Sequence, residues 1–483
     1  VNGPNVTEEP VKLEGFGPKD LYQSREKIFT RFVGGFFQRL RFFTGWPLLT
    51  GYFLLPWINW GGQQAVLFDL PARQFHIFTL TFYPQDFWLL GWMLMIAAFG
   101  LFTITTLVGR LWCGYTCPQT VWTDLFVLFE RWIEGDRNAR VRLWKAKWDM
   151  RKIRLRLTKY LAWVVIGLST GGAWVFYFTD APTLAVDLVQ GAAHPIAYTT
   201  IGVLTLTTIL FGAIAREQVC IYMCPWPRIQ AAMMDPDTIT VGYREWRGEP
   251  RGKHRKKAGA EELGDCIDCM ACVNVCPTGI DIRDGQQLEC ITCALCIDAC
   301  NDIMDKIGKP RGLIDYMALS DEERERAGEP PKSVWKHVFR VRTILYTTLW
   351  TAVGVGLVIA LFVRPDISAT VHPVRQPVFV TMSDGTIRNT YDFGLRNKHG
   401  EDRRFRVSLV SEEPELRIAV EGTPYESFMV PADTTGKQRI YVLAPNGSTP
   451  ALADRTEIRF WIEDLSNGER VYKDSTFVGT GAR

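Results

Sequence analysis

Several common features are missing from this sequence. No G-x-G-x-x-G run follows an expected strand, so a nicotinamide- or flavin-binding unit of the Rossmann type is not expected within the chain. The net charge is only +3 over 483 residues, which by itself says nothing about nucleic acid. The basic run Lys253–Lys257 is better explained by membrane topology than by RNA binding, so no nucleic-acid partner is expected. Residues 1–40 contain no long apolar core, which argues against a cleavable signal peptide.

Cysteine is missing beyond residue 363, yet eight of the twelve cysteines fall between residues 266 and 300. They form two C-x-x-C-x-x-C-x-x-x-C runs, the spacing of bacterial ferredoxins, in which the last cysteine of each run binds the other cluster. The spacing predicts electron transfer through two 4Fe–4S clusters, one held by Cys266, Cys269, Cys272 and Cys300, the other by Cys290, Cys293, Cys296 and Cys276. Structural zinc fits poorly, since zinc usually takes two separated C-x-x-C pairs.

Charged residues are missing from five stretches that are long enough to cross a bilayer, which takes about 20 apolar residues. The sequence therefore predicts five transmembrane helices, within Phe42–Phe68, Phe87–Gly109, Tyr160–Thr179, Pro195–Ala215 and Thr343–Val363. The first stretch contains Pro47 and Pro56, which leaves its ends the least defined. Contact with membrane lipid is expected.

Basic residues predict the orientation of these helices. Lys and Arg crowd the segment before the first stretch, the connection 110–159 and the region after the fourth stretch, whereas 180–194 has neither. Because basic loops stay in the cytoplasm, the N-terminus and the ferredoxin segment are expected there and the C-terminus outside. The domains expected are 1–41 (cytoplasmic segment), 42–225 (four-helix membrane region), 226–342 (cytoplasmic, ferredoxin core 260–305), 343–363 (fifth helix) and 371–483.

The remaining four cysteines form a repeated motif. One copy reads Cys113-Gly-Tyr-Thr-Cys117-Pro118 and the other Cys220-Ile-Tyr-Met-Cys224-Pro225. Each follows a pair of apolar stretches, which suggests a duplicated helical hairpin. Cysteines at i and i+4 share one helix face, and the proline is expected to end or kink the helix. Four thiolates at the membrane surface favour a soft metal ion or an iron–sulfur species. The alternative is that they are buried free cysteines that only pack, which the duplication of the motif disfavours.

Residues 371–483 have the alternating apolar and polar pattern that is typical of a β-sandwich. Apolar and polar residues alternate around Phe405 and Phe460, and turn signals such as Asp384-Gly385 and Asn446-Gly447 separate the expected strands. About 110 residues with this pattern suit an immunoglobulin-like fold. Residues 1–24 and Gly308–Lys332 are expected to be exposed polar connectors.

Taken together, the two ferredoxin-type runs, the paired C-x-x-x-C-P motifs and the β-rich tail resemble the FixG/RdxA/CcoG family of cytochrome oxidase accessory proteins. The resemblance implies a protein of the bacterial inner membrane, with a periplasmic C-terminal domain, that reduces Cu(II) to Cu(I) for the cbb3-type cytochrome c oxidase. It makes Cys113, Cys117, Cys220 and Cys224 the implied catalytic copper site. The implied partners are copper ions, a copper transporter or chaperone, and oxidase assembly proteins.

Other readings stay open at this point. The C-x-x-x-C-P motifs also resemble those of NapH and NosR membrane ferredoxins, which suggests a quinol-linked electron conduit to a redox partner. A copper-binding assembly scaffold without enzymatic activity is a third possibility, and iron instead of copper could occupy the four-thiol site. The electron donor, a separate reductase or a quinol, is not visible in the sequence.

Overall fold

The computed structural model describes residues 27–78, 80–252, 263–363, 367–397, 401–411, 415–422, 427–431 and 434–482. The connector expected at 1–24 and the first residues of the expected ferredoxin core, 260–262, lie outside these ranges. The chain divides into two compact units, one up to Val355 and one from Gly356 onward.

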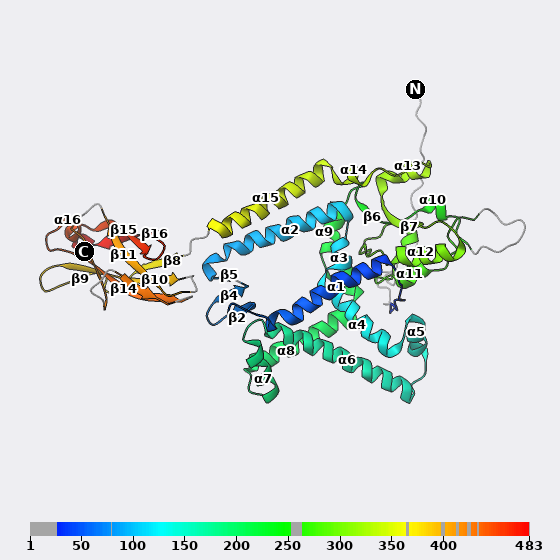
Figure 1. The fold of residues 1–483 in the computed structure, drawn as a ribbon, viewed down its shortest axis with the longest axis horizontal. Helices are drawn as coiled ribbons and strands as arrows, with labels where there is room; N and C mark the ends of the chain where they lie inside the picture. Colours follow the sequence, from blue (N-terminus) through cyan, green and yellow to red (C-terminus); the bar gives the residue numbers. More distant parts are fainter. Residues whose placement is uncertain are drawn as a thin grey trace, which may run out of the picture. The chain divides into compact units, whose positions relative to one another are not determined.

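Helices dominate the first unit (Figure 1). Those up to the second C-x-x-x-C-P motif are α1 (Phe36–Leu54), α2 (Trp88–Val108), α3 (Leu111–Tyr115), α4 (Pro118–Glu134), α5 (Arg137–Lys145), α6 (Met150–Val175), α7 (Ala181–Gln190) and α8 (Pro195–Thr208), followed by the π-helices η3 (Ile209–Ala215) and η4 (Val219–Met223). The later ones are α9 (Trp226–Met233), α10 (Glu245–Gly248), α11 (Ala271–Val275), α12 (Leu295–Ile307), α13 (Glu322–Arg326), α14 (Val334–Val338) and α15 (Val341–Val363).

Three of the described helices are long and apolar enough to cross a membrane: α2, α8 with its extension η3, and α15. They fall on three of the five expected stretches. Helices also form at the other two, but α1 carries Arg39 and Arg41, and α6 begins with a basic segment at Arg151. A count of five spans therefore stays a prediction. Helices α2 and α15 pack together, and a side chain at Gly100 would meet the Trp350 indole at 3.1 Å.

The structure places the ends of the helix at the first stretch, which the sequence left undefined. Helix α1 ends at Leu54, well before Phe68, and a short 3-10 turn leads into small antiparallel strands. Pro56 lacks the N–H that would continue the helix, and Gly61 and Gly62 adopt positive φ in the turn that follows. The strands are β1 (Asn59–Trp60), β2 (Gln63–Gln64), β3 (Val66–Asp69), β4 (Gln74–Ile77) and β5 (Leu80–Phe82).

The two helical hairpins exchange the helices that follow their cysteine motifs. Helix α4, which follows the first motif, packs on α6 and η3 of the second hairpin. Helix α9, which follows the second motif, packs on α2 of the first hairpin. The contact at η3 is tight, because a Cβ at Gly212 would lie 2.7 Å from the Phe126 ring. This exchange joins the duplicated hairpins into one body.

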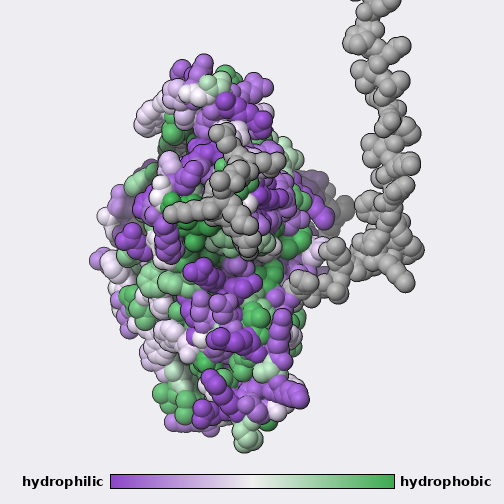
Figure 2. Space-filling model, turned by 90° about the vertical axis from the view of Figure 1, so that its right-hand side faces the viewer, coloured by the Kyte–Doolittle hydropathy of each residue, from purple (hydrophilic) through white to green (hydrophobic). Residues whose placement is uncertain are grey.

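The ferredoxin segment is larger than the expected core 260–305. Strand β6 (Ile239–Tyr243) pairs antiparallel with β7 (Ile314–Ala318), and Leu313 and Ile314 are buried between them and α12. The expectation that Gly308–Lys332 is an exposed connector was therefore wrong for its strand. Asp298 of α12 accepts a hydrogen bond from the Gln38 backbone N–H at 2.9 Å, which docks the start of α1 on this segment. Figure 2 faces the end that carries α10, α12 and α13, where polar residues surround small apolar patches.

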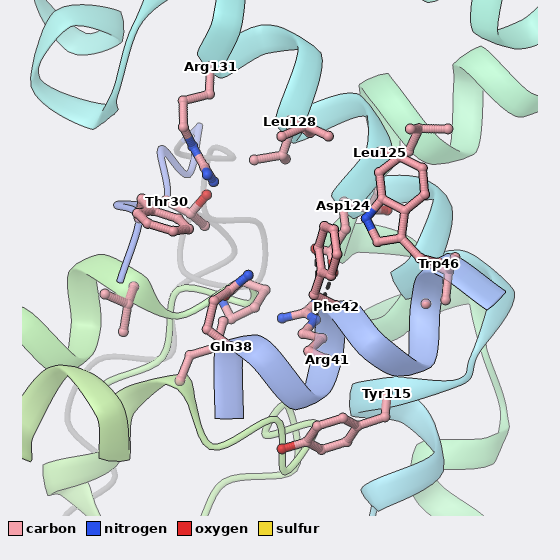
Figure 3. A pocket seen from close by; sticks show the side chains of 18 of the residues that line it. Thr30, Gln38, Arg41, Phe42, Trp46, Tyr115, Asp124, Leu125, Leu128 and Arg131 are labelled. Atoms are coloured by element: carbon pink, nitrogen blue, oxygen red, sulfur yellow. Dashed lines mark hydrogen bonds and ion pairs between the residues drawn. The ribbon is translucent and has the colours of Figure 1, made fainter. Parts of the chain in front are cut away.

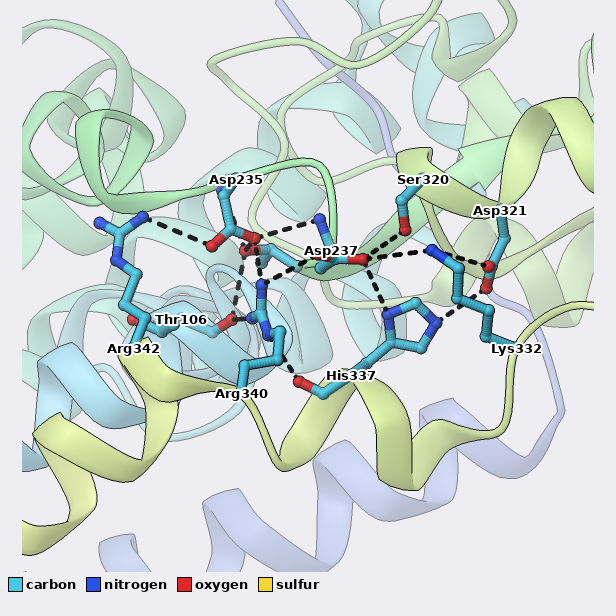
Figure 4. A network of polar contacts seen from close by, with 10 residues as sticks. Thr106, Asp235, Asp237, Ser320, Asp321, Lys332, His337, Arg340 and Arg342 are labelled. Atoms are coloured by element: carbon cyan, nitrogen blue, oxygen red, sulfur yellow. Dashed lines mark hydrogen bonds and ion pairs between the residues drawn. The ribbon is translucent and has the colours of Figure 1, made fainter.

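A network of carboxylates and basic groups ties the end of α2 to the start of α15 (Figure 4). Arg340 donates to the Thr106 carbonyl at 2.9 Å and pairs with Asp235 at 2.5 Å. Asp237 accepts from the Ser320 hydroxyl at 2.5 Å and lies 3.4 Å from His337. We call these groups the α2 clasp. It fixes the helix end just before the first cysteine motif.

The second unit is a β-sandwich. Its described strands form one sheet in the order β12-β14-β10-β8, with β9 beside β10, and another in the order β13-β11-β15-β16. Tyr391 and Phe393 of one sheet make edge-to-face contacts with Phe460 of the other, with ring centroids 5.1 and 4.9 Å apart. The strands are β8 (Ile367–Pro373), β9 (Val380–Thr381), β10 (Ile387–Asn397), β11 (Arg403–Val410), β12 (Arg417–Val420), β13 (Ser427–Val430), β14 (Thr435–Ala444), β15 (Arg455–Asp464) and β16 (Arg470–Val478).

Candidate redox site

The ferredoxin segment contains two small cavities walled by cysteine. The first cluster cavity is lined by Cys266, Cys269, Cys272 and Cys300, together with apolar side chains such as Leu313 and Ile314. The second cluster cavity is lined by Cys276, Cys290, Cys293 and Cys296, and Cys272 forms part of its wall too. The structure thus brings together the two sets of four that the spacing predicts, including the exchange of the last cysteine of each run.

The backbone around each cavity has a repeated conformation that the sequence reasoning missed. Asp268 and Met270, on either side of Cys269, have φ of 52° and 58°, and Thr292 and Ala294, around Cys293, have φ of 54° and 60°. Left-handed residues beside right-handed ones turn successive N–H groups to one side and form concave nests that suit anions, including iron–sulfur clusters. The residues present therefore fit two 4Fe–4S clusters. The sequence gives little indication of this left-handed conformation, because none of these four residues is glycine.

Half of these eight cysteines are buried, and burial disfavours the charged thiolate. Desolvation raises the pKa of Cys272, Cys293 and Cys300 to about 12. It raises the pKa of Cys296 further, helped by the neighbouring cysteines. Only Cys269 is exposed among the eight. Because a metal-bound thiol must lose its proton, binding of iron here is coupled to proton release.

The four remaining cysteines come together between the two hairpins and the second cluster cavity. Burial raises the pKa of the Cys113 thiol to about 12. The thiolate charges of Cys117, Cys220 and Cys224 interact with Cys113 and raise its pKa as well. The Cys113 thiol also donates to Gln230 Oε1 at 3.3 Å. We call these four the thiol site. Across the described residues no group of three or more His, Cys, Asp or Glu side chains has the arrangement of a single-ion site.

The expectation that each pair lies on one helix face was wrong. Cys113 lies in α3, but this helix ends before Cys117, which precedes α4. Cys220 lies in the π-helix η4, and Cys224 follows it with extended backbone angles. Pro118 is the first residue of α4, and Pro225 is the N-cap residue just before α9. Proline suits the start of a helix and cannot continue the previous one. Each motif is thus a helix break that turns two thiols toward the same region.

Arg110 connects the thiol site to the second cluster cavity, and the sequence reasoning did not single it out. Its side chain is buried and donates to the carbonyls of Leu288, Cys290 and Pro227. Its charge reaches the thiols of Cys113, Cys224 and Cys290, and desolvation lowers its own pKa. A buried cation between thiols is a direct means of stabilising negative charge there. Its position three residues before Cys113 was the one feature of the sequence that could have indicated a role at the thiol site.

The first motif touches the second cluster cavity directly. A Cβ at Gly114 would lie 2.7 Å from the Ile291 carbonyl oxygen and 3.0 Å from Cys293 Cα. The Tyr115 hydroxyl donates to the Cys293 carbonyl at 3.1 Å. Cys113 packs against the apolar cluster that contains Cys293 and Cys296. The first motif of the thiol site therefore packs directly against the loop of the second cluster cavity.

Comparison with known proteins identifies the family. A 4Fe-4S dicluster domain matches residues 215–319, a 4Fe-4S binding domain matches 90–135, and the IG-like fold at the C-terminus of FixG matches 357–480. Protein RdxB of Cereibacter sphaeroides is 57% identical over 95% of this chain and 98% of its own length. The chain belongs to the FixG/RdxA family. Protein RdxA of the same organism is 54% identical (93% of this chain, 96% of RdxA), and the nitrogen fixation protein FixG of Rhizobium meliloti is 47% identical (89% and 86%).

Membership of the FixG/RdxA family confirms several expectations. The protein is iron–sulfur and oxidoreductase-like, it carries an immunoglobulin-like C-terminal domain, and its apolar helices agree with a membrane protein. The family match also adds a fact that the sequence reasoning did not have. The 4Fe-4S binding domain at 90–135 covers Cys113 and Cys117, which lie outside the ferredoxin runs.

Proposed function

We propose that this FixG/RdxA-family protein transfers single electrons to Cu(II) at the thiol site and releases Cu(I) for assembly of the cbb3-type cytochrome c oxidase. The observation that carries the proposal is the direct packing of the first cysteine motif on the second cluster cavity, through Gly114, Tyr115 and Arg110. A store of electrons and a group of soft ligands are thereby held next to each other. Copper transporters or chaperones and oxidase assembly proteins are the partners proposed for the product.

The chain's own residues prepare both ends of the transfer. The eight ferredoxin cysteines would hold the two clusters, which supply one-electron chemistry when bound. Apolar residues such as Val241 and Ile282 wall off the second cluster cavity from water. At the other end, Cu(II) is the substrate, and it becomes Cu(I) by gaining one electron. Thiolates prefer the soft cuprous ion, so the thiol site favours the product.

The proposed topology follows from the charge pattern. Helices α2, α8 with η3, and α15 are proposed spans, and the apolar portions of α1 and α6 are proposed to complete five. Basic residues on α5 and at the start of α6 then lie on the cytoplasmic side. The thiol site, at the ends of α2 and η3, is proposed to face the cytoplasm, and the C-terminal domain the periplasm of the inner membrane.

The test uses anaerobically purified, dithionite-reduced protein mixed with Cu(II), with Cu(I) followed by a specific chelator. The parent protein is expected to form Cu(I) in step with bleaching of the cluster absorbance. The Cys220→Ser/Cys224→Ser variant is expected to lose at least about nine tenths of this activity while keeping its ferredoxin iron. Met223→Leu, which removes a soft side chain between the two cysteines, is the matched control. Equal Cu(I) formation by the cysteine variant and the parent would contradict the copper assignment.

A second candidate for the thiol site is iron, which the 4Fe-4S binding domain over 90–135 favours. Two clusters account for about eight irons per chain, and a further cluster would raise this to about twelve. Iron analysis of the parent and of Cys113→Ser/Cys117→Ser separates the two. An unchanged iron content near eight supports a copper-binding thiol site, whereas a fall of about four irons supports an iron–sulfur species there.

A further inference from the structure

A cavity of about 550 Å³ lies between the segment before α1, helix α1 and helix α4 (Figure 3). Neither the sequence motifs nor the proposed electron route accounts for it. Its volume falls within the range of small-molecule sites, about 300–1,000 Å³. It is large enough for one ring-sized head group with part of an apolar tail.

One side of this cavity is apolar and adjoins an exposed apolar surface of the protein. Phe42, Trp46, Leu125 and Leu128 line it. Phe42 and its neighbour Phe43 are 51% and 71% exposed, although both are large and apolar. Exposed aromatic residues of this kind suit a lipid interface. A ligand that enters here can do so from the membrane, without crossing water.

The other side of the cavity is polar. In Figure 3 the Arg131 guanidinium and the Gln38 side chain point into it from opposite walls, with Thr30 between them. Arg41 is 5% exposed and pairs with Asp124 at 2.7 Å beside the Phe42 ring. The cavity therefore offers hydrogen-bond donors from two sides of an aromatic slot, with a carboxylate nearby.

The floor of this cavity lies next to the second cluster cavity, although the two cavities share no lining residue. The floor is lined by Val275 and Pro277, which flank Cys276 in sequence, and by Leu295, which precedes Cys296 and packs in one apolar cluster with Cys293. Tyr115, also in the floor, donates to the Cys293 carbonyl, and the Arg41 charge reaches the Cys293 thiol. A molecule bound here thus lies against the loop that the proposed function uses for electron transfer.

We propose that this cavity binds a membrane quinol, with the ring between Gln38 and Arg131 and the isoprenoid tail along Phe42 and Trp46. The inference rests on the proposed function and names its electron donor. One quinol that reduces two Cu(II) to two Cu(I) becomes the quinone and releases two protons, so electrons and charge balance. The position favours a lipid-soluble redox carrier over a protein donor, which is too large to enter the cavity. It also favours such a carrier over a phospholipid, which cannot donate electrons to the neighbouring cluster.

Binding is measured first, with decylubiquinone added to the full chain in detergent and a photoreactive azidoquinone used to map the contact. The expected label is on peptides of α1 and α4. Gln38→Leu and Arg131→Met should each weaken binding about five- to tenfold, the effect of one lost hydrogen bond. Arg142→Met, on the exposed face of α5, is the control and should bind like the parent. Labelling elsewhere, or equal affinity in all variants, overturns the site.

A steric variant gives an independent readout. Leu128→Trp fills the cavity and should abolish quinone binding, whereas Leu168→Trp, on an exposed part of α6, should not. Lipid extracted from the parent protein is analysed in parallel. A phospholipid that stays bound and that decylubiquinone does not displace overturns the proposal.

Two electron sources separate this inference from the proposed function. If Leu128→Trp reduces copper with dithionite but not with decylubiquinol, both proposals are supported. If the parent reduces copper with dithionite yet binds no quinone, the proposed function stands and the quinol site fails. If quinone binds at this cavity but neither reductant yields Cu(I), the site stands and the copper assignment fails.

Discussion

The two cysteine motifs share a pattern but have different surroundings, and aligning them on their cysteines shows how. Gly109 and Arg216 occupy the same position, and both have the same unusual backbone, with φ, ψ of 55°, −121° and 48°, −112°. At the next position the first half has Arg110 and the second Glu217. The residue after the first cysteine is Gly114 in one half and Ile221 in the other. The duplicated backbone is conserved within the chain, while its side chains have diverged.

This divergence follows what each half contacts. Arg110 and Gly114 lie against the loop of the second cluster cavity. Arg216 and Glu217 instead line the cavity proposed for quinol. The same backbone turn therefore packs against the loop of the second cluster cavity in one half and lines the cavity proposed for quinol in the other. Exchanging single residues between the halves tests this reading.

The largest effect is expected from Gly114→Ile, which gives the first motif the residue of the second. A Cβ at this position would lie 2.7 Å from the Ile291 carbonyl, which is backbone and cannot move aside cheaply. Overpacking of this kind costs about 1–3 kcal/mol or more. We expect loss of about half of the iron, from the second cluster cavity, as measured by iron analysis and electron paramagnetic resonance.

Gly91→Ile is the control for this change. Gly91 lies in α2 and has open space within 4 Å of its added Cβ, so the variant should keep all its iron. Full cluster content in Gly114→Ile would mean that the first motif does not depend on close packing against the cysteine loop.

The next effect concerns the strained position of the second half. Arg216→Gly copies Gly109 and relieves a left-handed backbone that costs about 1–3 kcal/mol for a residue with a side chain. It also removes a buried partner of Glu130, which costs about 3–5 kcal/mol when one member of a buried pair is deleted. Arg140 still pairs with Glu130, which favours the lower end. We expect a net destabilisation of about 2 kcal/mol, seen as a lower thermal unfolding temperature.

The double variant Arg216→Gly/Glu130→Gln separates the two contributions. Because Glu130→Gln alone also weakens the pair with Arg140, this single variant is measured as the reference. In that background Arg216→Gly should cost less than in the parent, since the carboxylate partner is already gone and the strain relief remains. A single variant that is more stable than the parent would show that the ion pair contributes less than the strain.

A smaller effect is expected on the potential of one cluster. Arg110→Gln removes a buried positive charge whose field reaches Cys290 but which faces the thiol site rather than the first cluster cavity. The reduced cluster carries one more negative charge, so its potential should fall, by about 60 mV for a tenfold change in a one-electron equilibrium. A spectroscopic redox titration resolves both clusters. The first cluster is the internal control, and Arg110→Lys should restore most of the shift.

The sequence predicted the parts of this molecule whose signal is local. The cysteine spacing, the apolar helices and the Gly385 and Gly447 turns are all short patterns with one physical reading. Arg110 could not be predicted, because its partner carbonyl at Leu288 is 178 residues away. Strand β7 was missed since its five residues gain their order from pairing with β6. The end of helix α1 could not be placed within Phe42–Phe68, because apolar content does not distinguish a helix from the small strands that follow Leu54.

The smallest expected effect is on the stability that the α2 clasp gives to the end of the first hairpin. The second hairpin end relies on the buried Glu130, whereas the α2 clasp relies on carboxylates that water partly reaches. The hydrogen bond from Ser320 and nearby cations hold the pKa of Asp237 below its ordinary value. A lowered folded-state pKa means that this stabilisation is complete above the unfolded pKa of about 3.9 and is lost as the pH falls through the folded value.

Ser320→Ala should therefore destabilise the protein at pH 7 but not at a pH below the folded-state pKa of Asp237, where the carboxylate is protonated in both proteins. Because the Asp237 side chain is 38% exposed, the loss is expected to stay below about 1 kcal/mol, or about 2 °C in thermal midpoint. Added salt should shrink it further. Ser333→Ala, at the N-cap of α14 where no side-chain cap bond forms, is the control. An effect of Ser320→Ala that is equal at both pH values would mean that the clasp acts through packing and not through its charges.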